Sequence, residues 1–255
     1  MIYEFRTYTL KTRQLQEYWK RFTEKLPGRE AFSKLGGHWY SEIGPLNQMV
    51  AVWPYEDLNQ RADIRERAEA GPNPAWPPNS GELIVDMVSR IYLPAPFARP
   101  LGPGKHGPLY ELRLYTYAAE AIPTVLDVWG ENIEAREALS PLIGCWYTEY
   151  GGQDNFIHLW AYPSFEERMR IRQEARDGGI WPPPSPVIPV DRKVSSCFQL
   201  PSRRFSSPID SGPNGDTGIF SERPKSTDSR LPSRLPRVQP RPGRNRFDQR
   251  SGCHR

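Results

Sequence analysis

The chain has 255 residues, of which 37% are hydrophobic and 25% charged, with 28 Pro and a formal net charge of +4 at pH 7. So few apolar residues, with Pro at about twice its usual ~5% share, indicate that part of the chain lies outside any core. No apolar run approaches the ~18 residues that a membrane span needs, which excludes a transmembrane helix. Three widely spaced Cys argue against a disulfide framework or a zinc site and favour a reducing compartment, by default the cytoplasm.

A repeat at an offset of 107 residues sets the predicted organisation. Segment 3–9 (YEFRTYT) matches 110–116 (YELRLYT), and 35–44 (LGGHWYSEIG) matches 142–151 (LIGCWYTEYG). Two copies of this length indicate a duplicated domain rather than a solenoid, which needs at least three shorter units. We therefore expect repeats at 1–98 and 109–201, joined by a Pro- and Gly-rich linker at 99–108.

Each copy is predicted to fold as strand, helix, strand, strand, helix, strand. Period-two alternation and helical spacing of apolar residues are the signals for the first strand and helix of each copy. In the first copy we expect strands 2–9, 37–43, 48–53 and 82–93, with helices within 12–34 and 56–70. In the second we expect strands 109–116, 144–150, 155–160 and about 190–200, with helices 119–139 and 164–176. This order predicts an α+β fold of two tandem ferredoxin-like repeats.

The segment after the second copy carries the positive charge. Residues 202–255 hold 12 Lys and Arg against 5 Asp and Glu, whereas residues 1–201 hold 22 against 25. With almost no aliphatic side chains, this segment cannot bury enough surface to offset the entropy of ordering, so we predict a disordered basic tail. Its Arg lack interleaved aromatic residues, so we expect no specific nucleic-acid partner.

Alternation along the strands separates apolar from polar side chains. We expect the apolar set, such as Phe5, Val52 and Leu159, to pack on the helices, which leaves the polar set in the space between the two sheets. A turn at 44–47 would place Tyr40 beside Ala51 across the hairpin. The expected inter-sheet residues are Glu4, Arg6, Tyr8, Tyr40, Glu42, Trp53, Glu111, Arg113, Tyr115, Tyr147, Glu149, His158 and Trp160.

Such a polar set has two interpretations. Buried charges persist only when they are paired, so it indicates either a salt-bridged network of the Glu4–Arg6 type or a cavity that holds a ligand. Within it, His158 beside Tyr147, with Glu149 two residues away on the same face, is the best candidate for a general base, together with Arg113. A structural histidine is the alternative.

Other patterns point to ordinary roles. His38 and the histidine of the second copy occupy different positions in their repeats, so we predict no metal site, and we predict no cofactor. The Arg runs at 61–67 and 168–172 interleave with Glu on helices and are expected to be solvated faces. The G-x-G-x-x-G at 102–107 precedes a strand rather than a helix, so we interpret it as linker.

The segments 35–48 and 151–162, with "G-P-L-N-Q" in the first and "G-G-Q-D" followed by "H-L-W-A-Y" in the second, resemble the signature of the NIPSNAP domain. The resemblance covers both copies. It implies a dimeric-type α/β-barrel formed within one chain, with two ferredoxin-like sheets packed face to face. The first copy departs from the pattern at Ala51-Val52-Trp53, where His-Leu-Trp is expected.

Two functions stay open at this point. One is binding of a small apolar or aromatic molecule between the sheets, a version of which adds cofactor-independent monooxygenase-like chemistry. The other, implied by relatives proposed to act in vesicle traffic or mitophagy, is a non-catalytic docking module. A cavity of roughly 300 Å³ lined by the predicted residues would favour the first, and a filled lumen the second. Homo-oligomerisation is open in both.

Overall fold

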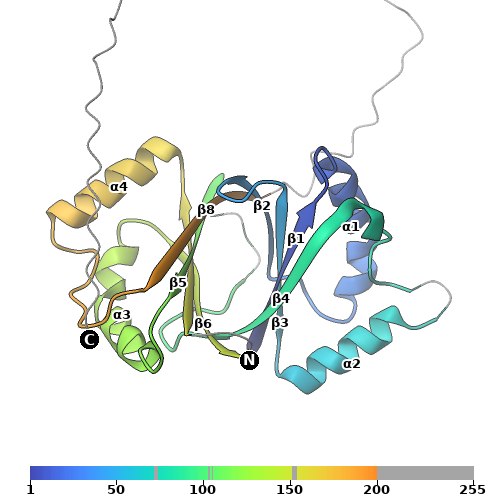
Figure 1. The fold of residues 1–255 in the computed structure, drawn as a ribbon, viewed down its shortest axis with the longest axis horizontal. Coiled ribbons are helices and arrows are strands. Elements are labelled where there is room, and N and C mark those ends of the chain that lie inside the picture. The colour runs from blue at the N-terminus through green and yellow to red at the C-terminus, as the bar shows by residue number, and fades with distance from the viewer. Residues whose placement is uncertain (72–73, 103, 105, 151–153, 200–255) are drawn as a thin grey trace, which may run out of the picture. The chain divides into compact units, whose positions relative to one another are not determined.

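The computed structural model describes residues 1–71, 74–102, 104, 106–150 and 154–199, without the side chains of Glu149 and of 194–199. The predicted disordered tail at 202–255 lies outside the described residues. Figure 1 shows the described part as a central set of strands with helices on two opposite sides.

The strands and helices follow the predicted order in both copies. Repeat one contains β1 (Ile2–Leu10), α1 (Leu15–Glu30), β2 (Gly37–Ile43), β3 (Gln48–Tyr55), α2 (Leu58–Glu69) and β4 (Ile84–Pro94), with a 3-10 turn at Gly81–Leu83. Repeat two contains β5 (Leu109–Thr116), α3 (Ile122–Glu137), β6 (Leu142–Tyr150), β7 (Asn155–Tyr162), α4 (Phe165–Asp177) and β8 (Asp191–Gln199). The predicted elements are confirmed, and their ends differ from prediction by a few residues.

The second helix of each repeat begins at an equivalent cap. The Asp57 carboxylate accepts a hydrogen bond from the Gln60 N–H at 2.8 Å, and the Ser164 hydroxyl accepts one from the Glu167 N–H at 3.2 Å. Such caps satisfy N–H groups that have no partner within the helix. Among the described helices, none combines the length and the apolar run that crossing a bilayer requires.

The strands form one closed antiparallel barrel in the order β1-β3-β2-β8-β5-β7-β6-β4. Each repeat contributes a four-stranded sheet of ferredoxin-like order. The two sheets join edge to edge where β2 pairs with β8 and β4 pairs with β6. Helices α1 and α2 cover one side of the barrel and α3 and α4 the other (Figure 1). The predicted intramolecular α/β-barrel is confirmed.

The lumen of the barrel is apolar, and the prediction that charged faces meet there is wrong. Aromatic side chains of the two repeats contact each other inside: the Phe5 ring lies 5.0 Å from the Trp146 ring, and Trp39 lies 5.8 Å from Tyr110. The interior cluster consists of Tyr3, Phe5, Trp39, Val50, Val52, Tyr92, Tyr110, Ile143, Trp146, Ile157, Leu159 and Ala161. A cavity of only about 10 Å³ is found among the lumen residues. The described side chains thus fill the lumen and leave no room among them for a ligand between the sheets.

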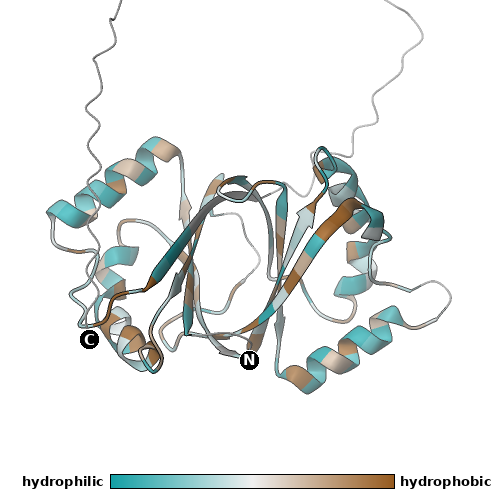
Figure 2. Ribbon diagram, viewed as in Figure 1, coloured by the Kyte–Doolittle hydropathy of each residue, from teal (hydrophilic) through white to brown (hydrophobic). Residues whose placement is uncertain are grey.

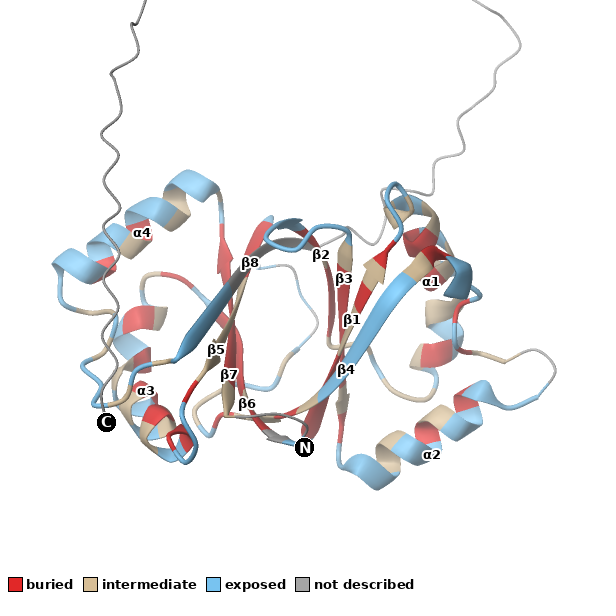
Figure 3. Cartoon of the chain, viewed as in Figure 1, coloured by how far each residue is buried: buried red, intermediate tan, exposed pale blue. Residues whose placement is uncertain are grey.

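The charged and polar face lies under the helices instead. Tyr8, Met49 and Trp53 belong to one cluster with Tyr18 and Phe22 of α1. The alternation of side chains is as predicted, but its direction is reversed. Figure 3 shows β3 and β7 buried along most of their length, so helices cover one face of each strand and the opposite sheet covers the other. Hydrophobicity does not tell two buried faces apart.

The hairpin register also differs from prediction by two residues. Tyr40 pairs with Met49 rather than Ala51, and Tyr147 pairs with Phe156 rather than His158. The turn is longer because a side chain closes it: the Ser41 hydroxyl accepts a hydrogen bond from the Gln48 N–H at 3.3 Å. A shift of two residues keeps every side chain on its face.

Candidate functional site

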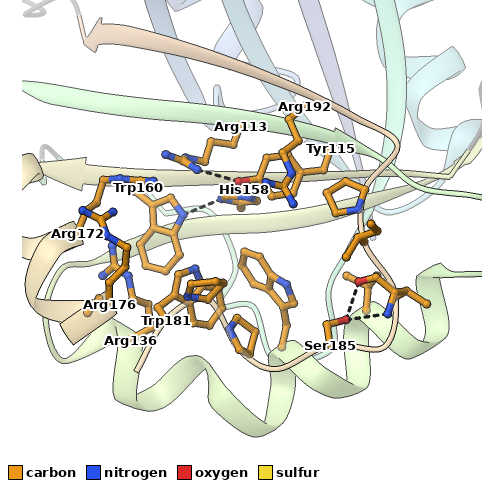
Figure 4. A pocket seen from close by; sticks show the side chains of 18 of the residues that line it. Arg113, Tyr115, Arg136, His158, Trp160, Arg172, Arg176, Trp181, Ser185 and Arg192 are labelled. Atoms are coloured by element: carbon orange, nitrogen blue, oxygen red, sulfur yellow. Dashed lines mark hydrogen bonds between the residues drawn. The ribbon is translucent and has the colours of Figure 1, made fainter. Parts of the chain in front are cut away.

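A pocket of about 270 Å³ lies between the repeat-two sheet and the elements that cover it. Side chains converge on it from the sheet, from α3 and α4, and from the segment that follows α4 (Figure 4). Its described lining includes six aromatic residues and five arginines, and no acidic side chain. The aromatic residues are Tyr115, Tyr117, Trp129, Trp160, Tyr162 and Trp181, and the arginines are Arg113, Arg136, Arg172, Arg176 and Arg192. We call this site the repeat-two pocket.

Four of the predicted site residues line the repeat-two pocket: Arg113, Tyr115, His158 and Trp160. Glu111 is fully buried behind them and pairs with Arg113. Tyr147 is not among the lining residues, so the predicted grouping of His158, Tyr147 and Arg113 is not brought together. The repeat-one residues Glu4, Arg6, Tyr8, Tyr40 and Trp53 lie at the equivalent face of the other sheet, Glu42 is exposed at the end of β2, and the Glu149 side chain is not described.

His158 is held in one tautomer by its neighbour. The Trp160 Nε1–H donates a hydrogen bond to His158 Nδ1 at 2.7 Å (Figure 4). An indole N–H is only a donor, so Nδ1 is the acceptor and the proton of the neutral ring is on Nε2. His158 Nε2 is buried and has no hydrogen-bond partner among the described residues. The lining therefore contains one imidazole N–H, buried at the pocket wall, that has no partner among the described residues.

The charges around His158 oppose its protonation. Burial, and then the positive charges of Arg113, Arg136 and Arg172, lower the pKa of His158 well below its ordinary value of 6.5. The ring is neutral at pH 7, and its only unprotonated nitrogen is occupied by Trp160. This arrangement suits a hydrogen-bond donor and not the predicted general base, which needs a free nitrogen near neutral pKa.

Buried salt bridges tie the second helix of each repeat to its sheet. Glu4 accepts hydrogen bonds from Arg61 of α2 and from Ser89, each at 2.6 Å, and its Oε1 lies 3.4 Å from Arg6 Nε. Burial alone would raise the pKa of Glu4, but these hydrogen bonds and the Arg6 charge outweigh it and lower the pKa. The predicted salt-bridged network of the Glu4–Arg6 type is thus present, under the helices.

The same network in repeat two reaches the pocket. Glu111 pairs with Arg168 and, at 3.5 Å, with Arg172 of α4. Helices α2 and α4 are mostly hydrophilic in Figure 2, but the prediction that their Arg runs are solvated faces is wrong for Arg61, Arg168 and Arg172. An arginine reaches a buried carboxylate because its long apolar stem crosses the protein surface.

A difference between the repeats leaves room for the pocket. At an offset of 107, Val125 in the pocket lining corresponds to Tyr18 in α1. Tyr18 is 1% exposed and its ring lies 5.5 Å from Tyr8 and 6.0 Å from Phe22. Those two rings correspond to Tyr115 and Trp129 of the pocket. The Tyr18 ring therefore fills in repeat one the space that Val125 leaves open in repeat two.

Sequence reasoning missed several lining residues. Arg136, Arg176, Arg192, Trp129 and Trp181 were not predicted as site residues. Trp181 contacts Trp129 at 4.6 Å between ring centroids, so the Trp-Pro-Pro loop forms one wall. The signal that could have found part of this set is a comparison of the two repeats, because some of its positions change charge or size.

The part of the chain that the structure describes contains no group of side chains that forms a metal centre. No three His, Cys, Asp or Glu side chains lie close enough there to hold a metal ion. The pocket instead offers guanidinium groups, aromatic faces and one imidazole N–H, which suit an organic molecule.

Comparisons with known proteins identify the family. The NIPSNAP family model matches residues 3–99 and 110–187. The chain is 27% identical over 188 residues to Protein NipSnap homolog of Dictyostelium discoideum, covering 71% of this chain and 78% of that one. It is 27% identical over 185 residues to human Protein NipSnap homolog 3A, covering 69% and 73%. A putative monooxygenase from Lactobacillus acidophilus shares the fold, with a TM-score of 0.54 at 9% identity over 78% of this chain and 93% of that one. The chain belongs to the NIPSNAP family.

Proposed function

We propose that this chain binds a small planar aromatic molecule in the repeat-two pocket. The observation that carries the proposal is the space of about 270 Å³ walled by aromatic rings on the helix-covered side of repeat two. Aromatic walls with a few polar groups are typical of small-molecule sites. The ligand is thus placed in the repeat-two pocket, where there is space for it, and not in the lumen, where the sequence analysis expected it.

The asymmetry between the repeats supports one site per chain. Val125 leaves open the space that the Tyr18 ring occupies in repeat one, where it contacts Tyr8 and Phe22. The strand position of the histidine also differs, because Ala51 stands where repeat two has His158, and the histidine of repeat one, His38, is on β2 instead. Binding is therefore expected at a ratio of one ligand per chain.

Catalysis is not part of the proposal. Trp160 occupies His158 Nδ1, and the surrounding arginines hold the imidazole neutral, so His158 is assigned the role of hydrogen-bond donor to the ligand. The likeness to a putative monooxygenase concerns the fold alone and assigns no chemistry. Docking to a protein partner stays the alternative, and the filled lumen favours it over a ligand between the sheets.

The test is a calorimetric titration of the full chain with 2-naphthoate and with its neutral amide, 2-naphthamide. Val125→Tyr should weaken binding at least about tenfold by placing a ring in the pocket, as Tyr18 does in repeat one. Thr124→Tyr, on the same turn of α3 but outside the pocket lining, is the matched control and should bind as the wild type does. Equal binding by the two variants, or no binding of either compound to the wild type, would refute the proposal.

A further inference from the structure

We propose that the ligand of the repeat-two pocket is an anion, specifically a planar aromatic carboxylate. This inference rests on the proposed function and adds the charge of the ligand to it. It follows from a comparison of the pocket with the equivalent positions of repeat one, which has the same network of Glu, Arg and aromatic residues but a different charge around it.

The first charge difference is a reversal on the second helix. Arg176 of α4 lines the pocket, and its counterpart at an offset of 107 in α2 is Glu69. In repeat one Glu69 neutralises its neighbour, because its Oε1 lies 2.9 Å from Arg65 Nη2. In repeat two the counterpart of Arg65 is Arg172, which therefore has a second arginine one turn away instead of a carboxylate.

The second difference is on the last strand. Arg192 of β8 pairs with Tyr115 in the barrel, and Met87 of β4 has the same register position opposite Tyr8. The Arg192 guanidinium lies 5.6 Å from the centre of the Tyr115 ring, over a wall of the pocket. Together the two positions make the pocket more positive than its repeat-one counterpart by three charges.

The added charges are not neutralised within the described residues. Arg176 donates to the Gln173 side chain, and neither Arg176 nor Arg192 forms an ion pair with a described carboxylate. Arg136 is different: it donates to Ser140 and Tyr162, as its counterpart Arg29 does to Ser33 and Tyr55, so its contacts belong to the fold.

The available charges fit a carboxylate in particular. Guanidinium groups bind carboxylates through paired N–H donors, and the His158 Nε2–H adds a neutral donor. Burial, and then the positive charge of Arg113, lower the pKa of the Arg172 guanidinium. The negative charge of a bound anion would raise this pKa again. An aromatic ring against the aromatic walls and a carboxylate bound by the unneutralised arginines that line the pocket would satisfy both halves of the site.

The experiment compares three compounds of one shape on the full chain by calorimetry: 2-naphthoate, 2-naphthamide and 2-naphthylmethylammonium. We expect 2-naphthoate to bind at least about tenfold more tightly than the amide, and the ammonium compound to bind most weakly. Arg176→Glu, which installs the repeat-one charge, should weaken 2-naphthoate by about tenfold and the amide by less than about twofold. Arg192→Met should act in the same direction.

Arg170→Glu is the matched control, since it makes the same charge change on the same helix outside the pocket lining. It should leave both affinities within about twofold of the wild type. Both target arginines are exposed, so these variants are expected to fold. Amide binding as tight as that of 2-naphthoate would overturn the inference and leave the proposed function standing. Equal effects of Arg176→Glu and Arg170→Glu would also overturn it, and failure of all three compounds to bind would remove the proposed function and the inference together.

Discussion

The imidazoles of His38 and His158 occupy the same cross-strand pair in the two repeats but come from opposite strands. His38 on β2 pairs with Ala51 on β3, whereas in repeat two the histidine is on β7 and pairs with Cys145 on β6. Each ring contacts the equivalent aromatic residue of the covering helix. The distance between ring centroids is 4.0 Å from His38 to Phe22 and 4.7 Å from His158 to Trp129. One imidazole is thus kept beneath the first helix of each repeat, and only in repeat two does it line the pocket.

The first prediction concerns stability in acid. Burial lowers the pKa of His38 to about 3, below the ordinary value of 6.5, so the unfolded chain binds the proton first. Stability is then lost as the pH falls from about 6.5 toward 3, by about 1.4 kcal/mol per pH unit for this residue. The free energy of unfolding, measured by urea denaturation between pH 7 and pH 4, should therefore depend less on pH in His38→Phe than in the wild type, by this slope. Parallel curves for wild type and His38→Phe would contradict the assignment.

The second prediction concerns the His158 tautomer. Trp160→Phe removes the donor to Nδ1, so the population of the Nδ1–H form should rise. The ¹⁵N chemical shifts of the two imidazole nitrogens report this directly. Trp53→Phe, at the equivalent position of repeat one, is the control and should leave the His158 shifts unchanged. Identical shifts in wild type and Trp160→Phe would show that the hydrogen bond does not set the tautomer.

The third prediction tests the filled lumen. A Cβ at Gly37 would lie 1.9 Å from the Trp39 ring, because residues two apart on a strand share a face. Gly37→Ala must displace an indole packed in the barrel interior and should cost about 1–3 kcal/mol of unfolding free energy. Gly81→Ala, where a Cβ meets nothing within 4 Å, is the control for denaturant unfolding. Equal stability of the two variants would mean that the lumen is not fully packed.

The fourth prediction tests the buried salt bridge of repeat one. Glu4→Gln leaves the guanidinium groups of Arg6 and Arg61 without their carboxylate partner. It should lower the free energy of unfolding by about 3–5 kcal/mol, because these largely buried charges are then unpaired. Glu69→Gln breaks an exposed pair with Arg65 and should change stability little. Urea unfolding at pH 7 compares the two. A Glu4→Gln variant as stable as Glu69→Gln would remove this network from the forces that hold α2 on the sheet.

Much of the fold could be predicted from the sequence because the duplication reports every element twice. The match of segment 3–9 to 110–116 located the first strand of each repeat, and the apolar spacing of Leu15, Trp19 and Phe22 located the helix that follows. What alternation along a strand cannot report is which of two buried faces points inward. Phe5 was expected on the helices and lies in the lumen, since both environments exclude water.

The site could be predicted only in part for a related reason. Arg113, Tyr115, His158 and Trp160 share one face of adjacent strands, so alternation grouped them correctly. Arg172 and Arg176 are on a hydrophilic helix and Arg192 is at the exposed start of β8, where a solvated arginine is the usual outcome. Their direction into the pocket depends on how α4 and β8 pack, which no local pattern encodes.

The most direct test of the central claim, that the ligand site lies under the helices of repeat two, uses the eight Trp of the chain as reporters. They divide into pocket, lumen and repeat-one groups, whose indole N–H resonances can be followed by ¹⁵N NMR while 2-naphthoate is added to the full chain. The pocket group is Trp129, Trp160 and Trp181, the lumen group is Trp39 and Trp146, and the repeat-one group is Trp19, Trp53 and Trp76. The account predicts that the resonances of the pocket group shift and those of the other two groups stay in place. Shifts confined to Trp39 and Trp146, with the pocket group unchanged, would contradict it.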